Sequence, residues 1–248
     1  MNLRLDLVLE YAPLFVEGLR NALLMTGVCL VVGVVLGVLL GMGRVADSQY
    51  VPQRYLLRYG VQWPIRIFVS FFRGTPLFVK IFLFHFAVMP LFVHPDGGWL
   101  FSGESARELR AEYGAFLSGA VAISLNLGAY LSEVFRAGIQ SIDRGQTDAA
   151  HSLGLGYWRT MRHIVLPQAF VRMLPATGNH AIFTLKDTSL VSAIGYGELA
   201  YAARSMAGAT ARSWEPYLTI SLIYWALVVV MSWGVLRLER HFGVQGRD

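Results

Sequence analysis

The sequence predicts an all-α integral membrane protein with about five transmembrane helices, its N-terminus outside and its C-terminus inside. Hydrophobic residues make up 55% of the 248 positions and charged residues only 15%, whereas a soluble domain usually carries about a quarter charged residues. Apolar segments long enough to cross a hydrocarbon core of roughly 30 Å recur along the chain. Arginines gather in alternate loops. Membrane lipid is therefore predicted to be the main solvent of this chain.

Five segments are predicted to cross the membrane in a single transmembrane domain, 1–248. The first is an unbroken apolar run, and an amphipathic stretch from Trp63 to Phe72 leads into the second. The fourth is weaker because Lys186 and Asp187 lie inside it, and a count of four stays open if this polar segment is re-entrant. The predicted spans are 22–43, 76–93, 114–135, 175–195 and 217–236.

The placement of arginine predicts which ends of the spans face inward. Arginines concentrate in the loop after the first span, in the long loop at about 137–172, and in the C-terminal tail. The loop after the second span is acidic, and the N-terminal arm is also acidic on balance. Because positively charged loops stay inside, the N-terminus is predicted outside and the C-terminus inside, as an odd number of spans requires. The N-terminal residues indicate no removable signal peptide.

The net charge of +5 comes almost entirely from arginine, since Lys80 and Lys186 are the only lysines. These arginines bracket apolar segments and do not form one patch, which favours a topology signal over nucleic-acid binding. No nucleic-acid partner is therefore expected.

The inward-facing stretch "TDAAHSLGLGYWRTMRHIVLPQA", 147–169, is polar and interrupted by glycines. Ser141 and Asp143 can cap a helix start, and Gly145 with Thr147 offers a second start signal. A short helix is expected from Asp148 to about Leu153, and Gly154 and Gly156 supply a turn. A second helix is expected over 157–166, ended by Pro167 because helices rarely continue through the residue before proline. An ordinary surface loop is the alternative, but structureless loops of this length are uncommon unless they are functional.

Residues in this stretch match a known signature. Asp148, Ala149 and Ala150, followed at the right spacing by Gly154 and by "IVLP" ending at Pro167, resemble the EAA signature of ABC importer membrane subunits, with Asp in place of Glu. Five segments, two of them within this stretch or overlapping it, are similar in the same order to the polar amino acid permease branch of that family. Together the matching segments extend from Phe71 to about Leu199, and they are "FFRGTPL", "NLGAYLSEVFRAGI", "GQTDAAHSLGL", "LPQA" and "KDTSLVSAIGYGEL".

The resemblance implies a type I ABC importer permease fold in a bacterial inner membrane. It implies a second permease subunit (the same chain or a paralogue), a cytoplasmic dimer of ATP-binding subunits, and a periplasmic or extracellular binding protein that delivers a polar amino acid. The loop would form a coupling helix that docks on the ATP-binding subunit. The residues implied in this coupling are Asp148, Ala149, Ala150, Leu153, Gly154, Leu155, Gly156 and Pro167.

No motif for covalent chemistry is found in the sequence. A phosphate-binding loop needs Gly-Lys-Ser/Thr, but Val79 precedes Lys80 and Leu185 precedes Lys186. No histidine begins an H-E-x-x-H zinc motif, and no G-x-S-x-G elbow is present. Cys29 is the only cysteine, which excludes an internal disulfide and a multi-thiolate metal site. We therefore expect no catalytic residue, metal or cofactor on this chain, with ATP and Mg bound by the partner ATPase.

Polar residues inside the spans are candidates for a translocation path, because charges at membrane depth are costly and usually serve a pathway or an internal pair. Each has a structural alternative. Lys186 and Asp187 could satisfy a helix break that faces the partner permease, Arg73 could extend to the inner surface, and Asn126 with Tyr130 could pack between helices. The candidates are Arg73, Thr75, Asn126, Tyr130, Glu133, Lys186, Asp187, Thr188 and Ser189. Lys80 is a further charge at membrane depth, within the second span.

Two further expectations concern the spans. A rival function is a secondary transporter or channel driven by an ion gradient, in which Glu133, Lys186 and Asp187 bind ions or protons. Gly33, Gly37 and Gly41 recur every fourth residue on the first span, and this small-residue face is most simply explained as a close contact between helices.

Overall fold

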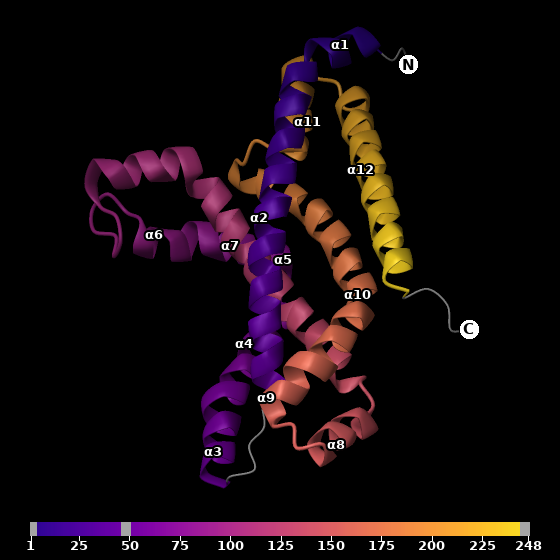
Figure 1. Ribbon diagram of the computed structural model, residues 1–248. Coiled ribbons are helices and arrows are strands. Elements are labelled where there is room, and N and C mark those ends of the chain that lie inside the picture. The colour runs from indigo at the N-terminus through magenta and orange to yellow at the C-terminus, as the bar shows by residue number, and fades with distance from the viewer. Residues whose placement is uncertain (1–3, 46–50, 244–248) are drawn as a thin grey trace.

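The computed structural model describes residues 4–45 and 51–243, and within these ranges every regular element is a helix (Figure 1). This confirms the predicted all-α class. The elements in chain order are α1 (Leu5–Glu10), α2 (Ala12–Val45), α3 (Val51–Leu56), η1 (Leu57–Gln62), α4 (Trp63–Gly74), α5 (Leu77–Phe82), η2 (Leu83–Val88), α6 (Met89–Phe92), α7 (Gly103–Gln140), α8 (Arg144–Ser152), α9 (Tyr157–Thr160), η3 (Met161–Val165), α10 (Leu166–Asp187), η4 (Thr188–Ile194), α11 (Leu199–Thr210) and α12 (Trp214–His241).

Three long helices, α2, α7 and α12, are long and apolar enough to cross a membrane, and they contain three of the predicted spans. The predicted span 76–93 is the second arm of a helix pair, 54–74 and 77–92, that is bent by 109° at the break. By length and composition, three of the described helices could each cross a membrane. The number rises to four if the bent pair forms one further span. The polar segment 175–195 is helical, as α10 and η4, but lies outside this set. The count of five stays a prediction.

The glycine face of α2 packs directly against α7, as the spacing of Gly33, Gly37 and Gly41 predicts. A Cβ added at Gly37 would lie 2.5 Å from Leu131 Cβ, and one at Gly33 would lie 2.5 Å from Leu127 Cδ2. Such distances are far below a van der Waals contact, so any side chain here would force the helices apart. The absence of side chains allows α2 and α7 to lie side by side along much of their length (Figure 1).

The bend between α4 and α5 follows from the sequence "RGTP". Thr75 adopts an extended conformation, with φ −113° and ψ 146°, as is usual for the residue before a proline. The Thr75 hydroxyl donates to Phe71 O (2.8 Å), which satisfies one of the carbonyls left unpaired where α4 ends. The chain therefore turns sharply here while most of its polar backbone groups keep partners.

The polar loop forms a short helix and a glycine turn, as expected, but its second half differs from the prediction. The Asp143 carboxylate caps α8 by accepting from Gly145 N (2.6 Å). Gly154 has φ +79°, a left-handed conformation that favours glycine. Pro167, however, does not end a helix, because α9, η3 and α10 run on through it. The segment outside the long helices is accordingly shorter than the predicted 137–172.

The wider π turn of η3 explains why the helix continues through Pro167. Pro167 has no N–H to donate within the helix, and such a residue usually breaks it. A π turn immediately before the proline changes the carbonyl pattern and makes room for the ring. The Gln168 side-chain amide also donates to Ile164 O (2.9 Å), which gives one carbonyl of this turn a donor.

Helix α11 was not predicted. It begins at Glu198, whose buried carboxylate accepts from Ala200 N (2.7 Å) and Tyr201 N (3.1 Å) and from the Tyr224 hydroxyl of α12 (2.6 Å). These bonds start the helix and tie it to α12.

Candidate functional site

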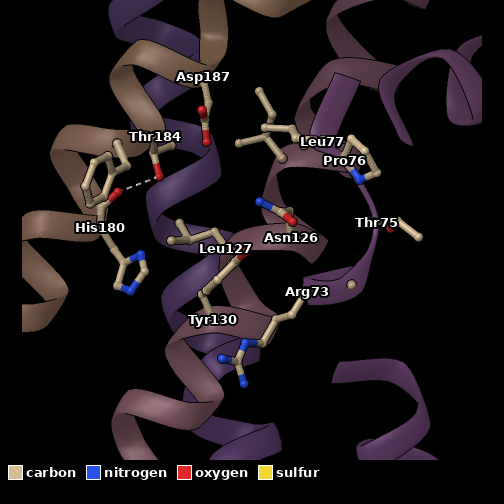
Figure 2. A pocket seen from close by; sticks show the side chains of 13 residues that line it. Arg73, Thr75, Pro76, Leu77, Asn126, Leu127, Tyr130, His180, Thr184 and Asp187 are labelled. Atoms are coloured by element: carbon tan, nitrogen blue, oxygen red, sulfur yellow. Dashed lines mark hydrogen bonds between the residues drawn. The ribbon is translucent and has the colours of Figure 1, made fainter. Parts of the chain in front are cut away.

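A cavity of about 590 Å³ lies between α7, α10 and the bend that joins α4 to α5 (Figure 2). Each of the three elements contributes both polar and apolar side chains to its walls. The lining residues are Arg73, Gly74, Thr75, Pro76, Leu77, Ile123, Asn126, Leu127, Tyr130, His180, Phe183, Thr184 and Asp187.

Five of the nine predicted path residues line this cavity. They come from three elements far apart in the sequence, and they are Arg73, Thr75, Asn126, Tyr130 and Asp187. Opposite charges thus face one volume, with the Arg73 guanidinium and the Asp187 carboxylate on different walls (Figure 2). A small zwitterion is the kind of ligand such a cavity complements.

The other four predicted path residues lie outside the lining. Lys186 is exposed, with its ammonium 4.7 Å from the centre of the Phe183 ring. Thr188 is fully buried and donates to Leu185 O (2.7 Å), and Ser189 donates to Lys186 O (2.7 Å). These hydroxyls satisfy carbonyls at the end of α10, whereas the structural alternative considered from the sequence gave that role to Lys186 and Asp187. Glu133 lies in a separate ionic network.

The buried Lys80 fixes one wall of the cavity. Its side chain is 1% exposed, and Nζ donates to Phe72 O and to Asn126 Oδ1 (2.5 Å). An ammonium can only donate, so the oxygen of the Asn126 amide must face Lys80 and the amide nitrogen remains available to donate to a ligand. The bond to Phe72 O also supplies a partner at the C-terminal end of α4, beside the bend.

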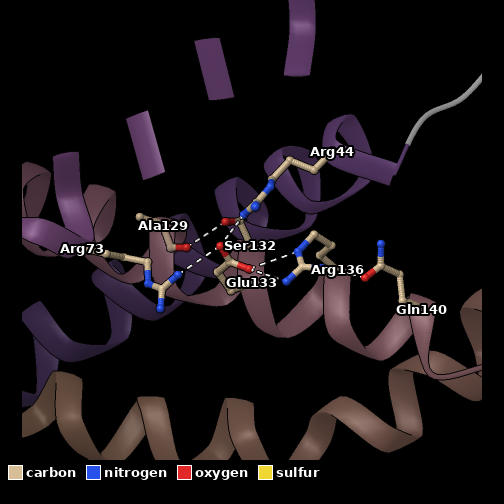
Figure 3. A network of polar contacts seen from close by, with 7 residues as sticks. All are labelled: Arg44, Arg73, Ala129, Ser132, Glu133, Arg136 and Gln140. Carbon is tan, nitrogen blue, oxygen red and sulfur yellow. Dashed lines mark hydrogen bonds and ion pairs between the residues drawn. The ribbon is translucent and has the colours of Figure 1, made fainter. Parts of the chain in front are cut away.

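Glu133 of α7 accepts bonds from three arginines (Figure 3). Arg44 at the end of α2 donates at 2.7 Å, Arg136 of α7 at 2.9 Å, and Arg73 at the end of α4 lies 3.0 Å away. The Glu133 side chain is only 23% exposed. One half-buried carboxylate therefore joins three helices, and bonds of this charge-assisted kind are stronger than neutral ones.

Arg73 belongs both to the lining of the cavity and to the ionic network around Glu133. It lines the cavity with its guanidinium 5.5 Å from the centre of the Tyr130 ring, and it also pairs with Glu133. The Arg73 side chain, which is 43% exposed, extends from the cavity to Glu133. A ligand carboxylate in the cavity would compete with Glu133 for this one guanidinium.

Sequence reasoning missed His180 and Thr184, and it noted Lys80 as a charge within a span without assigning it to the site. His180 lies 5.6 Å from Tyr130 between ring centres, and the Thr184 hydroxyl donates to His180 O (2.9 Å). His180, Thr184 and Asp187 are spaced by four and three residues, so they share one face of α10. That spacing was the signal that could have found them.

All the predicted coupling residues except Pro167, which lies in α10, gather on the short helix α8 and the turn that follows it. Asp148 and Ala149 are exposed, whereas Ala150 is 2% exposed and packs inward. Leu153 is 82% exposed, and the turn around Gly154 closes through a bond from Leu155 N to Ala150 O (3.0 Å). The loop therefore presents an acidic and an apolar side chain on a rigid turn. No cluster of three or more metal-binding side chains occurs in the described part of the chain.

Comparisons with known proteins agree with this architecture. The arginine transport system permease protein ArtQ of Bacillus subtilis (strain 168) is 32% identical over 240 residues, 97% of each chain. The glutamine transport system permease protein GlnP of Escherichia coli (strain K12) is 31% identical over 232 residues, 94% of each chain.

Solved structures show the same fold. The structure described as an amino acid ABC transporter with histidines has a TM-score of 0.79 at 30% identity and covers 97% of this chain and 100% of its own. The inward-facing MetNI methionine ABC transporter has a TM-score of 0.71 at 18% identity and covers 92% of this chain and 96% of its own. Residues 33–244 match the family described as binding-protein-dependent transport system inner membrane component. The chain belongs to this family of membrane-embedded transport subunits.

Proposed function

We propose that this chain is the permease subunit of an ATP-driven importer that carries polar amino acids across a bacterial inner membrane. The observation that carries the proposal is the cavity of about 590 Å³ with Arg73 and Asp187 on different walls. An amino acid offers a carboxylate to the guanidinium and an ammonium to the carboxylate, and the Asn126 amide nitrogen can donate to the same carboxylate. The relatives named for arginine and glutamine support this class of substrate.

The mechanism we propose is alternating access. A binding protein delivers the amino acid from outside, and a dimer of ATP-binding subunits moves two permease subunits between outward-facing and inward-facing states. Binding of ATP must favour one state over the other for transport to be driven. This chain does no covalent chemistry in the scheme, since ATP and Mg are bound by the partner ATPase.

The α8 loop is the proposed contact with that ATPase. The exposed Asp148 and Leu153 would dock on the partner, and the Gly154 turn would hold them in position. Asp148→Lys should abolish co-purification of the ATPase and uptake together, because it places a repelling charge at the contact. Asp96→Lys makes the same charge change at an exposed site far along the chain and should leave both unchanged. Unchanged assembly in Asp148→Lys would contradict the assignment of this loop.

Transport itself is tested in vesicles that contain the permease, the ATPase and the binding protein. We expect uptake of a radiolabelled polar amino acid to require ATP inside the vesicle. Uptake that persists without the ATPase and follows an ion gradient would instead support the secondary transporter. The cavity gives that rival little support, since Asp187 lines it but Glu133 and Lys186 do not.

A further inference from the structure

A second, strongly basic cavity lies at the other end of the described helices, beside the α8 loop. Its volume is about 830 Å³, and it lies between the ends of α2 and α7, the segment from α3 to α4, and the segment from α8 to η3. Arginines from five elements line it, and these are Arg44, Arg54, Arg58, Arg66 and Arg144. No carboxylate is among its described lining residues.

Three of these arginines keep their charge uncompensated within the described chain. Arg44 is engaged by Glu133 (2.7 Å). By contrast, Arg58, Arg66 and Arg144 are exposed, and no described carboxylate lies within ion-pair distance of them. Converging guanidinium groups without a counter-charge form a site for a polyvalent anion, above all a phosphate, which arginine binds through two donors.

The surroundings indicate that this anion belongs to a lipid. Apolar side chains also line the cavity, among them Leu57, Met161 and Val165. The outer side of the same segment exposes Tyr59 and Trp63, 59% and 57% exposed. Exposed tyrosine and tryptophan beside arginine are typical of the level at which lipid headgroups meet the hydrocarbon core. A site for a soluble phosphate would need neither the apolar wall nor the aromatic border.

We propose that this basic cavity binds the headgroup of an anionic phospholipid. Arg58, Arg66 and Arg144 contact the phosphate, and the acyl chains lie along the exposed aromatic and apolar side of η1 and α4. Basic cavities between helix ends at the membrane surface are suited to such headgroups. The lipid would join α4, which carries Arg73 at its far end, to the α8 loop. The proposal does not depend on the identity of the transported substrate.

The test is native mass spectrometry of the full-length protein in neutral detergent, titrated with phosphatidylglycerol or with phosphatidylcholine of the same acyl chains. In Arg58→Gln/Arg66→Gln we expect phosphatidylglycerol affinity to fall about 25-fold, since each arginine near a headgroup contributes about fivefold. Phosphatidylcholine binding should not change. Arg58→Lys/Arg66→Lys keeps both charges and should retain most of the affinity.

The matched control is Arg159→Gln/Arg162→Gln, which removes two exposed arginines that do not line the cavity. An equal loss in this control would overturn the proposal, because the effect would be one of net charge. Displacement of the lipid by inorganic phosphate at millimolar concentration would assign the cavity to a soluble anion. Retained lipid binding in Arg58→Gln/Arg66→Gln, together with loss of the co-purified ATPase, would make these arginines a protein contact and would equally overturn the proposal.

Discussion

At the scale of single residues, the two charged groups that face the candidate substrate cavity differ in whether they already have an ionic partner within the chain. Asp187 is the only carboxylate among the described lining residues, and Arg73 is the only guanidinium. Arg73 also pairs with Glu133 at 3.0 Å, so its charge is partly compensated before any ligand enters. Within the described part of the chain, no hydrogen bond or ion pair holds the Asp187 carboxylate. Asp187 is therefore the residue at which a ligand's ammonium gains most.

Asp187→Asn should weaken substrate binding while leaving the fold intact. The change keeps the shape and removes the charge that attracts an ammonium, and a hydrogen bond to a charged group contributes about 1.5–3 kcal/mol. The KM for ATP-dependent uptake should therefore rise by about 10- to 100-fold. Lys186→Gln is the control, because this neighbouring charge is exposed and does not line the cavity. Equal effects of the two variants would show that Asp187 is not a ligand.

Lys80→Met should raise the KM with little change in stability or kcat. Removing Nζ leaves Phe72 O and Asn126 Oδ1 without their donor, at about 1–3 kcal/mol for each group left unsatisfied. The change also removes a buried ammonium, whose desolvation costs several kcal/mol, so the two effects offset each other. The Asn126 amide becomes free to turn, and we expect about a fivefold rise in KM, equivalent to one hydrogen bond.

Lys80→Gln supplies the comparison for that measurement. Its amide can still donate to Asn126, so the KM should lie closer to that of the unchanged chain. Uptake kinetics measure the effect of each variant on the KM, and thermal unfolding in detergent measures its effect on stability. A large fall in unfolding temperature with an unchanged KM would show that Lys80 only supports the fold.

At the scale of elements, the site depends on how closely α2 and α7 approach and on the bend between α4 and α5. The glycine face of α2 lets α7 lie close, and α7 in turn supplies Asn126 and Tyr130 to one wall. The bend at Thr75 brings the end of α4 to the opposite wall. Short local sequence patterns determine both features: the glycine spacing allows the close approach, and "RGTP" produces the bend.

Gly37→Ala should destabilise the chain, although alanine forms helix better than glycine by about 1 kcal/mol. The added Cβ would lie 2.5 Å from Leu131 Cβ and 3.3 Å from the backbone carbon of Leu131. Overpacking of this kind costs about 1–3 kcal/mol. This cost exceeds the gain in helix propensity if α2 and α7 cannot move apart. The net cost is then up to about 2 kcal/mol, and we expect the unfolding temperature in detergent to fall by up to about 8 °C.

Gly27→Ala is the matched control in the same helix. A Cβ at Gly27 meets no atom within 4 Å, so only the gain in helix propensity remains. Its unfolding temperature should stay the same or rise slightly. If Gly37→Ala also left the temperature unchanged, the close approach of α2 and α7 would not be required for stability.

At the scale of the whole molecule, the sequence predicts what is periodic or local and misses what depends on distant packing. The long apolar helices, the glycine face and the capped α8 turn all follow from short patterns. Pro167 was wrongly expected to end a helix, since the π turn that accommodates it has no sequence rule. The cavity unites segments about 50 residues apart, so their meeting could not be derived from spacing. Five of its residues were selected in advance because polar groups inside apolar spans are costly and usually serve a pathway or an internal pair, not because of any periodicity.

The predicted orientation of the molecule in the membrane rests on the distribution of arginine alone. It can be tested at the two ends of α7. This helix has 38 residues, about 57 Å at 1.5 Å per residue, and the hydrocarbon core is only about 30 Å thick. Its two ends must therefore emerge on opposite sides if it crosses. Glu104 lies at its start and Gln146 lies in the α8 loop just beyond its end, and both are exposed.

Single cysteines at these positions report the two sides. The native Cys29 is 0% exposed and is first replaced by serine. In spheroplasts of the expression host, a membrane-impermeant maleimide should label Glu104→Cys and leave Gln146→Cys unlabelled, because positively charged loops stay inside. Both should react after the membrane is opened, which shows that each thiol is accessible. Labelling of Gln146→Cys alone in sealed spheroplasts would reverse the orientation, and it would place the α8 loop where no cytoplasmic ATPase could reach it.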